Sequence, residues 1–249
     1  MGKYFIGIMT GTSADALDGC VVSFEDKFEL ICSASITLDG SYKMDYEECI
    51  RAGFKNTNES KKLYELENIL NQKTIELINL LLKKADIDIS QVSSAGFSGQ
   101  TVFHTNEKSY QIGNPAYISE LSKIDVYSDF RNFDIKNGGI GAPLIPAFHK
   151  YLYAAEKDRL IFNIGGIANG TYLKKDEVAI ASDVGPGNCL LDYVSSKSFD
   201  KPFDDGGSEA AKGEVDNLLL KQLIDKCDGM TYPRADDKQD YYRLEELFT

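Results

Sequence analysis

Residues 5–36 read FIGIMTGTSADALDGCVVSFEDKFELICSASI, and residues 161–183 read IFNIGGIANGTYLKKDEVAIASD. Each stretch begins with a short apolar strand, continues through a turn rich in Gly, Thr, Ser, Asn or Asp, and ends in two further strand-like runs. Glycine in such a turn lets backbone N–H groups approach a phosphate closely. Two copies, one in each half of the chain, predict two lobes that close on one nucleotide, and therefore phosphoryl transfer.

The composition narrows the class of protein. A chain of 249 residues can form one large domain or two modest ones. Its formal net charge of −12 argues against a polyanion such as DNA as the main partner, but ATP needs only local donors and a metal. The five cysteines are scattered and form no CxxC pair, which indicates reduced thiols rather than disulfides or a zinc site. The N-terminal apolar run is too short for a signal peptide, so we expect a cytoplasmic protein.

Apolar periodicity predicts strands in groups of three, each group followed by helices. This grouping favours a two-lobed α/β protein with mixed sheets, with lobes at 1–128 and 129–249. Residues 129–143 are expected to form a glycine-rich loop, and residues 229–249 a polar tail. The sequence contains neither GxGxxG after its first strand nor GxxxxGK[ST], which argues against a dinucleotide-binding fold and a P-loop. The expected strands cover 4–9, 19–24, 28–38, 92–97, 125–128, 160–164, 168–174 and 177–182, and the expected helices 43–53, 59–84, 115–122, 144–155, 189–196 and about 208–226.

The first turn, residues 11–18, carries both donors and carboxylates. Its backbone N–H groups and the hydroxyls of Thr12 and Ser13 are suited to a terminal phosphate. Asp15 or Asp18 is suited to Mg²⁺, which favours carboxylates together with substrate oxygens. The alternative is a tight hairpin turn whose polar side chains cap their own backbone. The turn at 163–169 is its counterpart in the second half.

Asp183 follows a predicted strand and precedes a Gly-Pro-Gly turn. A carboxylate at such a position can face a cleft and act as a general base, or it can simply cap the following helix. Asp129, Arg131 and Asp134 form a second polar cluster that suits sugar hydroxyls or a carboxylate. The alternative for this cluster is an ordinary surface ion pair. Of the two histidines, His149 is expected to be structural.

An ordered set of motifs, spread over roughly residues 4–226, resembles the anhydro-N-acetylmuramic acid kinase family. No single motif is decisive, but the set occurs in that family's order. The motifs are GTSADALD (11–18), GQTVFH (99–104), QIG (111–113), DFR with DI (129–135), GAPLIPAFH (141–149), NIGGIAN (163–169) and DVGPGN (183–188).

This resemblance implies the duplicated actin/Hsp70/sugar-kinase fold, which is ribonuclease H-like, and it implies ATP and Mg²⁺ as cofactors. The implied activity opens 1,6-anhydro-N-acetylmuramic acid with water and phosphorylates O6, giving the 6-phosphate in cell-wall recycling. Asp183 is implied as the base that activates the water. A structural ATPase of the actin type shares the fold, but the 129–143 loop favours a small substrate.

The resemblance also implies which residues contact each ligand. The implied substrate-binding residues are Gln100, Asp129, Arg131 and Asp134. The implied nucleotide-binding residues come from both turns: Gly11, Thr12, Ser13, Ala14, Asp15, Ala16, Leu17 and Asp18 from the first, and Asn163, Gly165, Gly166 and Asn169 from the second.

Three residues depart from the family's usual pattern: Ala16 replaces glycine, Ser98 replaces histidine and Ile140 replaces glutamine. Members of the family also continue past the position of Thr249 with a segment that contributes to adenosine binding. We therefore expect an incomplete second lobe and either a homodimer or a separate chain that supplies the segment. The alternative function is a catalytically impaired relative that acts as a sugar-binding or regulatory module, or one half of a split kinase.

Overall fold

The computed structural model describes residues 3–227, 231–236, 241, 244, 245 and 248. The chain is a mixed α/β protein that divides into two compact units. The first unit contains residues 1–104 and 108–136, and the second contains residues 105–107 and 137–249.

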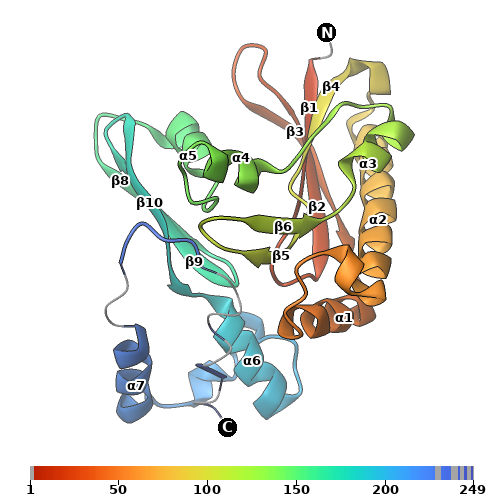
Figure 1. Ribbon diagram of the computed structural model, residues 1–249. Coiled ribbons are helices and arrows are strands. Elements are labelled where there is room, and N and C mark those ends of the chain that lie inside the picture. Colours follow the sequence, from red (N-terminus) through yellow and green to blue (C-terminus); the bar gives the residue numbers. More distant parts are fainter. Residues whose placement is uncertain (1–2, 228–230, 237–240, 242–243, 246–247, 249) are drawn as a thin grey trace. The chain divides into compact units, whose positions relative to one another are not determined.

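The first unit is built on a five-stranded mixed sheet with the order β3-β2-β1-β4-β7 (Figure 1). Strand β2 pairs antiparallel with both β1 and β3, whereas β4 lies parallel to β1, so the sheet is mixed as predicted. The pairing of β1 with β2 continues to Thr10 and Leu17, so β2 begins before the predicted residue 19. The strands are β1 (Tyr4–Thr10), β2 (Ala16–Ser23), β3 (Glu29–Thr37), β4 (Val92–Phe97) and β7 (Val126–Tyr127).

Helix α2 (Lys61–Ala85) packs against β2 and β3 and contributes a buried apolar stripe to the core of the first unit. Its leucines at spacings of three, four and seven are all buried, as the 3.6-residue period predicts. Gly19 on β2 allows the close approach, since a Cβ there would lie 2.8 Å from a methyl group of Leu81. The helix begins after the N-cap Ser60 and ends at Asp86, which adopts a left-handed conformation.

Shorter elements complete the first unit. Glu67 of α2, which the periodicity places among the solvated residues, accepts a hydrogen bond from the Gly113 N–H at 3.0 Å, and Asn71 accepts one from the Asn114 N–H at 2.8 Å. These bonds hold the segment that leads into α3. The elements are α1 (Gly40–Arg51), η1 (Thr57–Glu59), η2 (Ile89–Gln91), the hairpin strands β5 (Gln100–His104) and β6 (Ser109–Ile112), and α3 (Pro115–Ser122).

The predicted loop at 129–143 is wrong over its first half, because residues Phe130–Lys136 form the helix α4. The chain turns at Asp129, whose φ is 57°, and the Asp129 carbonyl accepts a hydrogen bond from the Phe133 N–H. The Asn132 side chain bonds both the N–H and the carbonyl of Ser109 at 2.9 Å. A helix of seven residues is too short to show a clear period, so tertiary anchors of this kind decide its formation.

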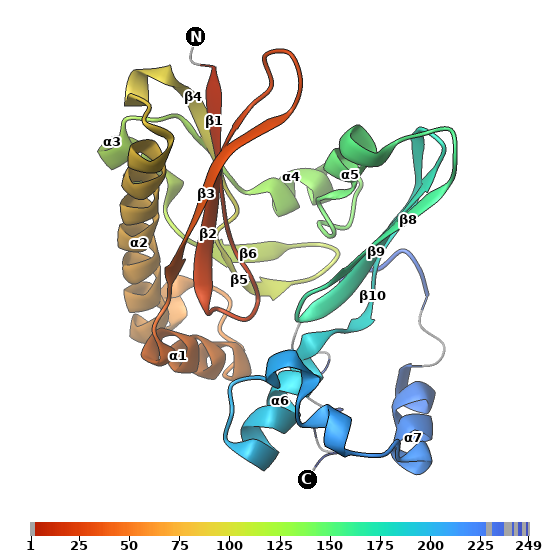
Figure 2. The ribbon, with the colours of Figure 1, turned by 180° about the vertical axis from the view of Figure 1, so that it is seen from behind.

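The second unit is built on a three-stranded antiparallel meander in the order β10-β9-β8 (Figure 2). The three predicted strands are thus confirmed, with β10 continuing four residues further than predicted. Helix α6 follows the meander directly, and α5 contacts β9 and β10. The elements are α5 (Pro146–Tyr153), β8 (Arg159–Ile164), β9 (Ile167–Lys174), β10 (Glu177–Pro186), α6 (Asn188–Phe199), η3 (Asp205–Gly207), η4 (Ala210–Lys212) and α7 (Asn217–Cys227).

The single helix predicted at about 208–226 is wrong. The chain leaves the helical conformation at Gly213, and α7 begins only at Asn217. The Asp216 carboxylate accepts hydrogen bonds from the N–H groups of Leu218 and Leu219, which caps the new helix. Residues 229 and 230 and most of residues 237–249 of the predicted polar tail lie outside the described residues.

Four cysteines have described side chains, and none of them is in a disulfide: Cys20, Cys32, Cys49 and Cys189. Within the described part of the chain, no helix combines the length and the apolarity needed to cross a membrane.

Candidate functional site

The β1–β2 turn of the first unit is closed by its own backbone and side chains. The Ala14 N–H donates to the Gly11 carbonyl at 3.1 Å, and Ala14 is fully buried with a φ of 50°. The Ser13 hydroxyl donates to the Asp15 carboxylate at 2.7 Å. The bond from Ser13 to Asp15 fits the self-capping hairpin. The phosphate-binding turn is also compatible with this stretch, because that bond engages only one of the two hydroxyls predicted to bind phosphate.

Gln100 connects this turn to the β5–β6 hairpin. Its side chain is completely buried, its amide oxygen accepts from the Thr10 hydroxyl at 2.7 Å, and its amide nitrogen donates to the Gly11 carbonyl at 3.0 Å. A buried amide with both ends bonded orients the start of the turn. This bracing role is one that the sequence reasoning did not find, because it depends on a contact between residues 90 positions apart.

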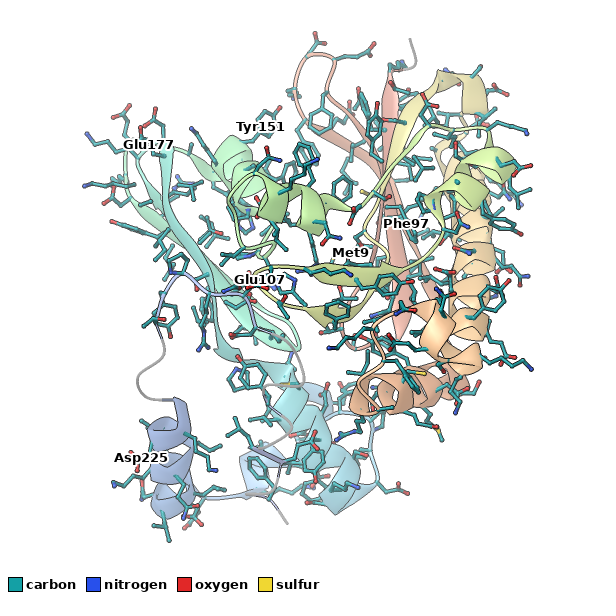
Figure 3. The ribbon with its side chains drawn as sticks, viewed as in Figure 1. Met9, Phe97, Glu107, Tyr151, Glu177 and Asp225 are labelled. Carbon is teal, nitrogen blue, oxygen red and sulfur yellow. The ribbon has the colours of Figure 1, made fainter. Side chains whose placement is uncertain are left out.

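The two candidate metal ligands of the first unit, Asp15 and Asp18, are both exposed. Asp18 lies on β2 directly opposite Met9 of β1, and Met9 is 61% exposed. Figure 3 labels Met9. Carboxylates of this kind suit Mg²⁺ as hard oxygen ligands. Among the described residues, no three His, Cys, Asp or Glu side chains gather into a ready metal site.

The predicted polar cluster lies at the start of α4. The Asp129 carboxylate accepts from the Asn132 amide at 2.5 Å, and Arg131 and Asp134 are half-buried on the same helix. Asn132, which the sequence reasoning did not single out, connects this cluster to Ser109 of β6. The helix therefore fixes the spacing between the cluster's side chains more firmly than the expected loop.

In the second unit, the β8–β9 turn rests on the beginning of α6. The N–H groups of Gly187 and Cys189 donate to the Gly166 carbonyl, and the Asn188 N–H donates to the Gly165 carbonyl at 2.8 Å. A Cβ on Gly187 would lie 2.3 Å from the Gly165 carbonyl oxygen, so only glycine permits this approach. The turn and the helix therefore form one hydrogen-bonded piece.

Three predicted site residues share one row across the meander. Asn163 of β8 pairs with Asn169 of β9, and Asn169 pairs with Asp183 of β10. Directly paired residues present their side chains on the same face of a sheet. The register therefore places two amides and one carboxylate on one face, next to the glycine turn. A bulge between Asp183 and Gly185 follows immediately, as is common where a strand re-aims a side chain.

Asp183 is not the cap of α6, so that alternative is wrong. The N-cap is Gly187, and no side chain caps this helix end. Asp183 is instead 6% exposed within β10, and its carboxylate accepts from the Asp236 N–H at 2.9 Å. The residues 231–236, which the sequence reasoning treated as part of a polar tail, thus lie beside the candidate base.

His149 contacts β9 two residues after Asn169. Its Nδ1 lies 3.0 Å from the Thr171 hydroxyl, and its ring lies near that of Tyr153. Burial lowers the pKa of His149 from its ordinary value. These contacts fit the structural role expected from the sequence.

The family model and the curated relatives that match this chain carry the same name. A family model described as "Anhydro-N-acetylmuramic acid kinase" matches residues 3–238. The curated anhydro-N-acetylmuramic acid kinase of Shewanella pealeana is 38% identical over 89% of this chain and 61% of its own length. That of Bordetella pertussis is 36% identical over 90% of this chain and 59% of its own length. The chain thus spans about three fifths of the curated relatives that it matches. Among solved structures, the ethanolamine utilization protein EutJ of Carboxydothermus hydrogenoformans is 14% identical with a TM-score of 0.43, over 91% of this chain and 71% of that one.

Proposed function

Because the chain belongs to the anhydro-N-acetylmuramic acid kinase family, we propose that it takes part in the ATP-dependent opening and phosphorylation of 1,6-anhydro-N-acetylmuramic acid. In the proposed reaction, water forms a bond to the anomeric carbon, the bond from that carbon to O6 breaks, and O6 takes the γ-phosphoryl group of ATP. The products are ADP and the 6-phosphate of the opened sugar. A kinase needs contacts to the phosphates of ATP, and the repeated strand–turn–strand pattern supplies two glycine turns suited to such contacts.

We propose further that the two halves of the chain, residues 1–128 and 129–249, are the lobes of a duplicated actin/sugar-kinase fold. The support is topological. Each half contains an antiparallel meander of three strands, β1-β2-β3 and β8-β9-β10, and a glycine-containing turn follows the first strand of each. Such a repeat is expected when one ancestral unit has been duplicated around a nucleotide.

The observation that carries the proposal is the row Asn163–Asn169–Asp183. In it, Asp183 is proposed to accept the proton of the attacking water, a task that needs a carboxylate held in one orientation. The two asparagines offer neutral donors and acceptors beside it, suited to phosphate or sugar oxygens. Burial keeps bulk water away from Asp183 and strengthens its polar contacts.

Each of the two glycine turns is proposed as a phosphate-binding turn. In the first unit the phosphate contacts come from the 11–18 turn, with Asp15 or Asp18 holding Mg²⁺. When bound, that ion neutralises charge on the phosphate oxygens. In the second unit they come from Asn163, Gly165, Gly166 and Asn169. Asp129, Arg131 and Asp134 are proposed to bind the sugar, and Gln100 to contribute to the same site while it braces Gly11.

The test is turnover of the purified chain with Mg-ATP and the anhydro sugar, followed by mass spectrometry of the sugar and measurement of ADP. We expect formation of the 6-phosphate, and a loss of about 100- to 10,000-fold in kcat for Asp183→Asn, because a positioned base contributes on that order. The matched control is Asp176→Asn, which removes an exposed carboxylate in the turn that leads into β10.

Two results would count against the proposal. If the unaltered chain forms no 6-phosphate, the proposed activity is wrong. If Asp183→Asn and Asp176→Asn turn over equally, the activity is supported but Asp183 is not the base.

A further inference from the structure

The segment 231–236 lies along β10 at the position of the proposed base. The Asp183 N–H donates to the Arg234 carbonyl at 3.0 Å, and the Arg234 N–H donates to the Ser182 hydroxyl at 2.9 Å. The Ser182 hydroxyl in turn donates to the Asp183 carbonyl at 2.7 Å. Backbone groups of the segment thus form hydrogen bonds with Ser182 and Asp183 of β10.

The side chains of the same region form a largely buried ionic network. The Arg234 guanidinium lies 2.9 Å from the Asp236 carboxylate and also donates to the Asp183 carbonyl at 3.3 Å. The side chains of Arg234 and Asp236 are only 13% and 10% exposed. The Tyr241 hydroxyl, on a residue that is 3% exposed, donates to the same carboxylate oxygen of Asp236. Burial and this hydrogen bond raise the pKa of Tyr241, so the phenol stays protonated as a donor.

This network holds the peptide N–H of Asp236 against the carboxylate of Asp183, the proposed base. The Asp236 N–H donates to Oδ2 of Asp183 at 2.9 Å. Asp236 is held through its own carboxylate by Arg234 and Tyr241, so the direction of its N–H depends on both of them. A buried carboxylate whose oxygen accepts a peptide hydrogen bond is restricted in its rotation, because breaking that bond leaves a buried charged group under-satisfied.

We propose that Arg234, Asp236 and Tyr241 are positioning residues for Asp183: they hold the Asp236 peptide against Oδ2 and thereby set the orientation of the base. The inference rests on the proposed function, in which Asp183 accepts a proton from water. A misplacement of a catalytic group by about 1 Å can cost on the order of 100-fold in rate. The network therefore contributes to turnover without contact with either substrate.

The variants that test this are Tyr241→Phe, which removes one hydroxyl, and Arg234→Lys, which keeps the charge but loses the guanidinium fork. We expect each to lower kcat by about 10- to 100-fold while KM for ATP and for the sugar stays within about twofold. Tyr172→Phe is the matched control, because its exposed hydroxyl also donates to an aspartate, Asp158, at 2.8 Å. Unchanged kcat in both variants, or a loss equal to that of the control, overturns the proposal.

A second readout does not require turnover. In ¹H–¹⁵N NMR spectra of the full chain, the Asp236 amide proton is expected to move upfield in Asp183→Asn, and to exchange faster with solvent in Tyr241→Phe. An Asp236 amide that responds to neither change overturns the positioning proposal, whatever the turnover. An amide that responds in a chain without turnover overturns the proposed function and supports the contact network.

Discussion

At the scale of single residues, the site depends on close approaches that only particular side chains permit. Gly187 is the sharpest case, because a Cβ there would lie 2.3 Å from the Gly165 carbonyl oxygen and 3.2 Å from the Ala168 nitrogen. Both neighbours are backbone atoms, so neither can rotate away. The motif Asp-Val-Gly-Pro-Gly-Asn shows glycine at this position, but the sequence alone does not show which turn the glycine contacts.

Gly187→Ala is therefore expected to separate the β8–β9 turn from α6. We expect a loss of about 1–3 kcal/mol in the free energy of unfolding, the usual cost of overpacking, together with weaker binding of Mg-ATP. Calorimetry measures both quantities. Gly213→Ala is the matched control, because a Cβ there would meet the nearest atom at an ordinary 3.6 Å. Equal stability of the two variants would show that the turn accommodates the methyl group.

At the scale of elements, the sequence predicted what local periodicity determines. The leucine spacing located α2 to within two residues at each end. The apolar runs located the three strands of each meander. Local periodicity missed α4, whose seven residues depend on Asn132 and Ser109, and it missed the break at Gly213. The contact of residues 231–236 with Asp183 was also beyond reach, because it joins positions about 50 apart in a stretch that shows no period of its own.

The buried stripe of α2 gives a prediction at this scale. Leu77 is fully buried against β2, where its methyl group would lie 2.9 Å from a Cβ on Gly19, whereas Leu80 on the same helix is 42% exposed. We expect Leu77→Ala to lower the free energy of unfolding by about 2–5 kcal/mol, and Leu80→Ala by less than about 1 kcal/mol. Urea unfolding followed by circular dichroism measures the difference. Similar losses for the two variants would contradict the packing described for α2.

At the scale of the whole molecule, the two units differ in how much apolar surface they bury. Among the described residues, the largest fully buried side chains belong to the first unit, with the single exception of Leu173. The second unit instead exposes large apolar side chains along an edge strand, where Leu160, Phe162 and Ile164 of β8 are each more than half exposed. Composition cannot reveal this asymmetry, because both halves contain similar apolar runs.

Hydrogen exchange of the full chain, followed by mass spectrometry, measures the consequence. Local stability follows buried apolar contact, so we expect amides of β1 and β2 to exchange at least about tenfold more slowly than those of β8 and β10. Peptides from α2 serve as an internal reference, since its leucines lie in the same core as β2. Equal protection in the two meanders would mean that the exposed side chains of β8 do not weaken the second unit.

The bonds between the β8–β9 turn and α6 also have an electrostatic consequence. The aligned peptides of a helix carry about half a positive charge at the N-terminus, and the first N–H groups of α6 point at the carbonyls of Gly165 and Gly166. Those carbonyls are polarised by the helix, and hydrogen bonds in series strengthen one another. An anion bound at the turn, as proposed above, would be favoured by the macrodipole behind it by at most about 0.3–1 kcal/mol. Under the proposed function, the second glycine turn would therefore favour negative charge without any lysine or arginine.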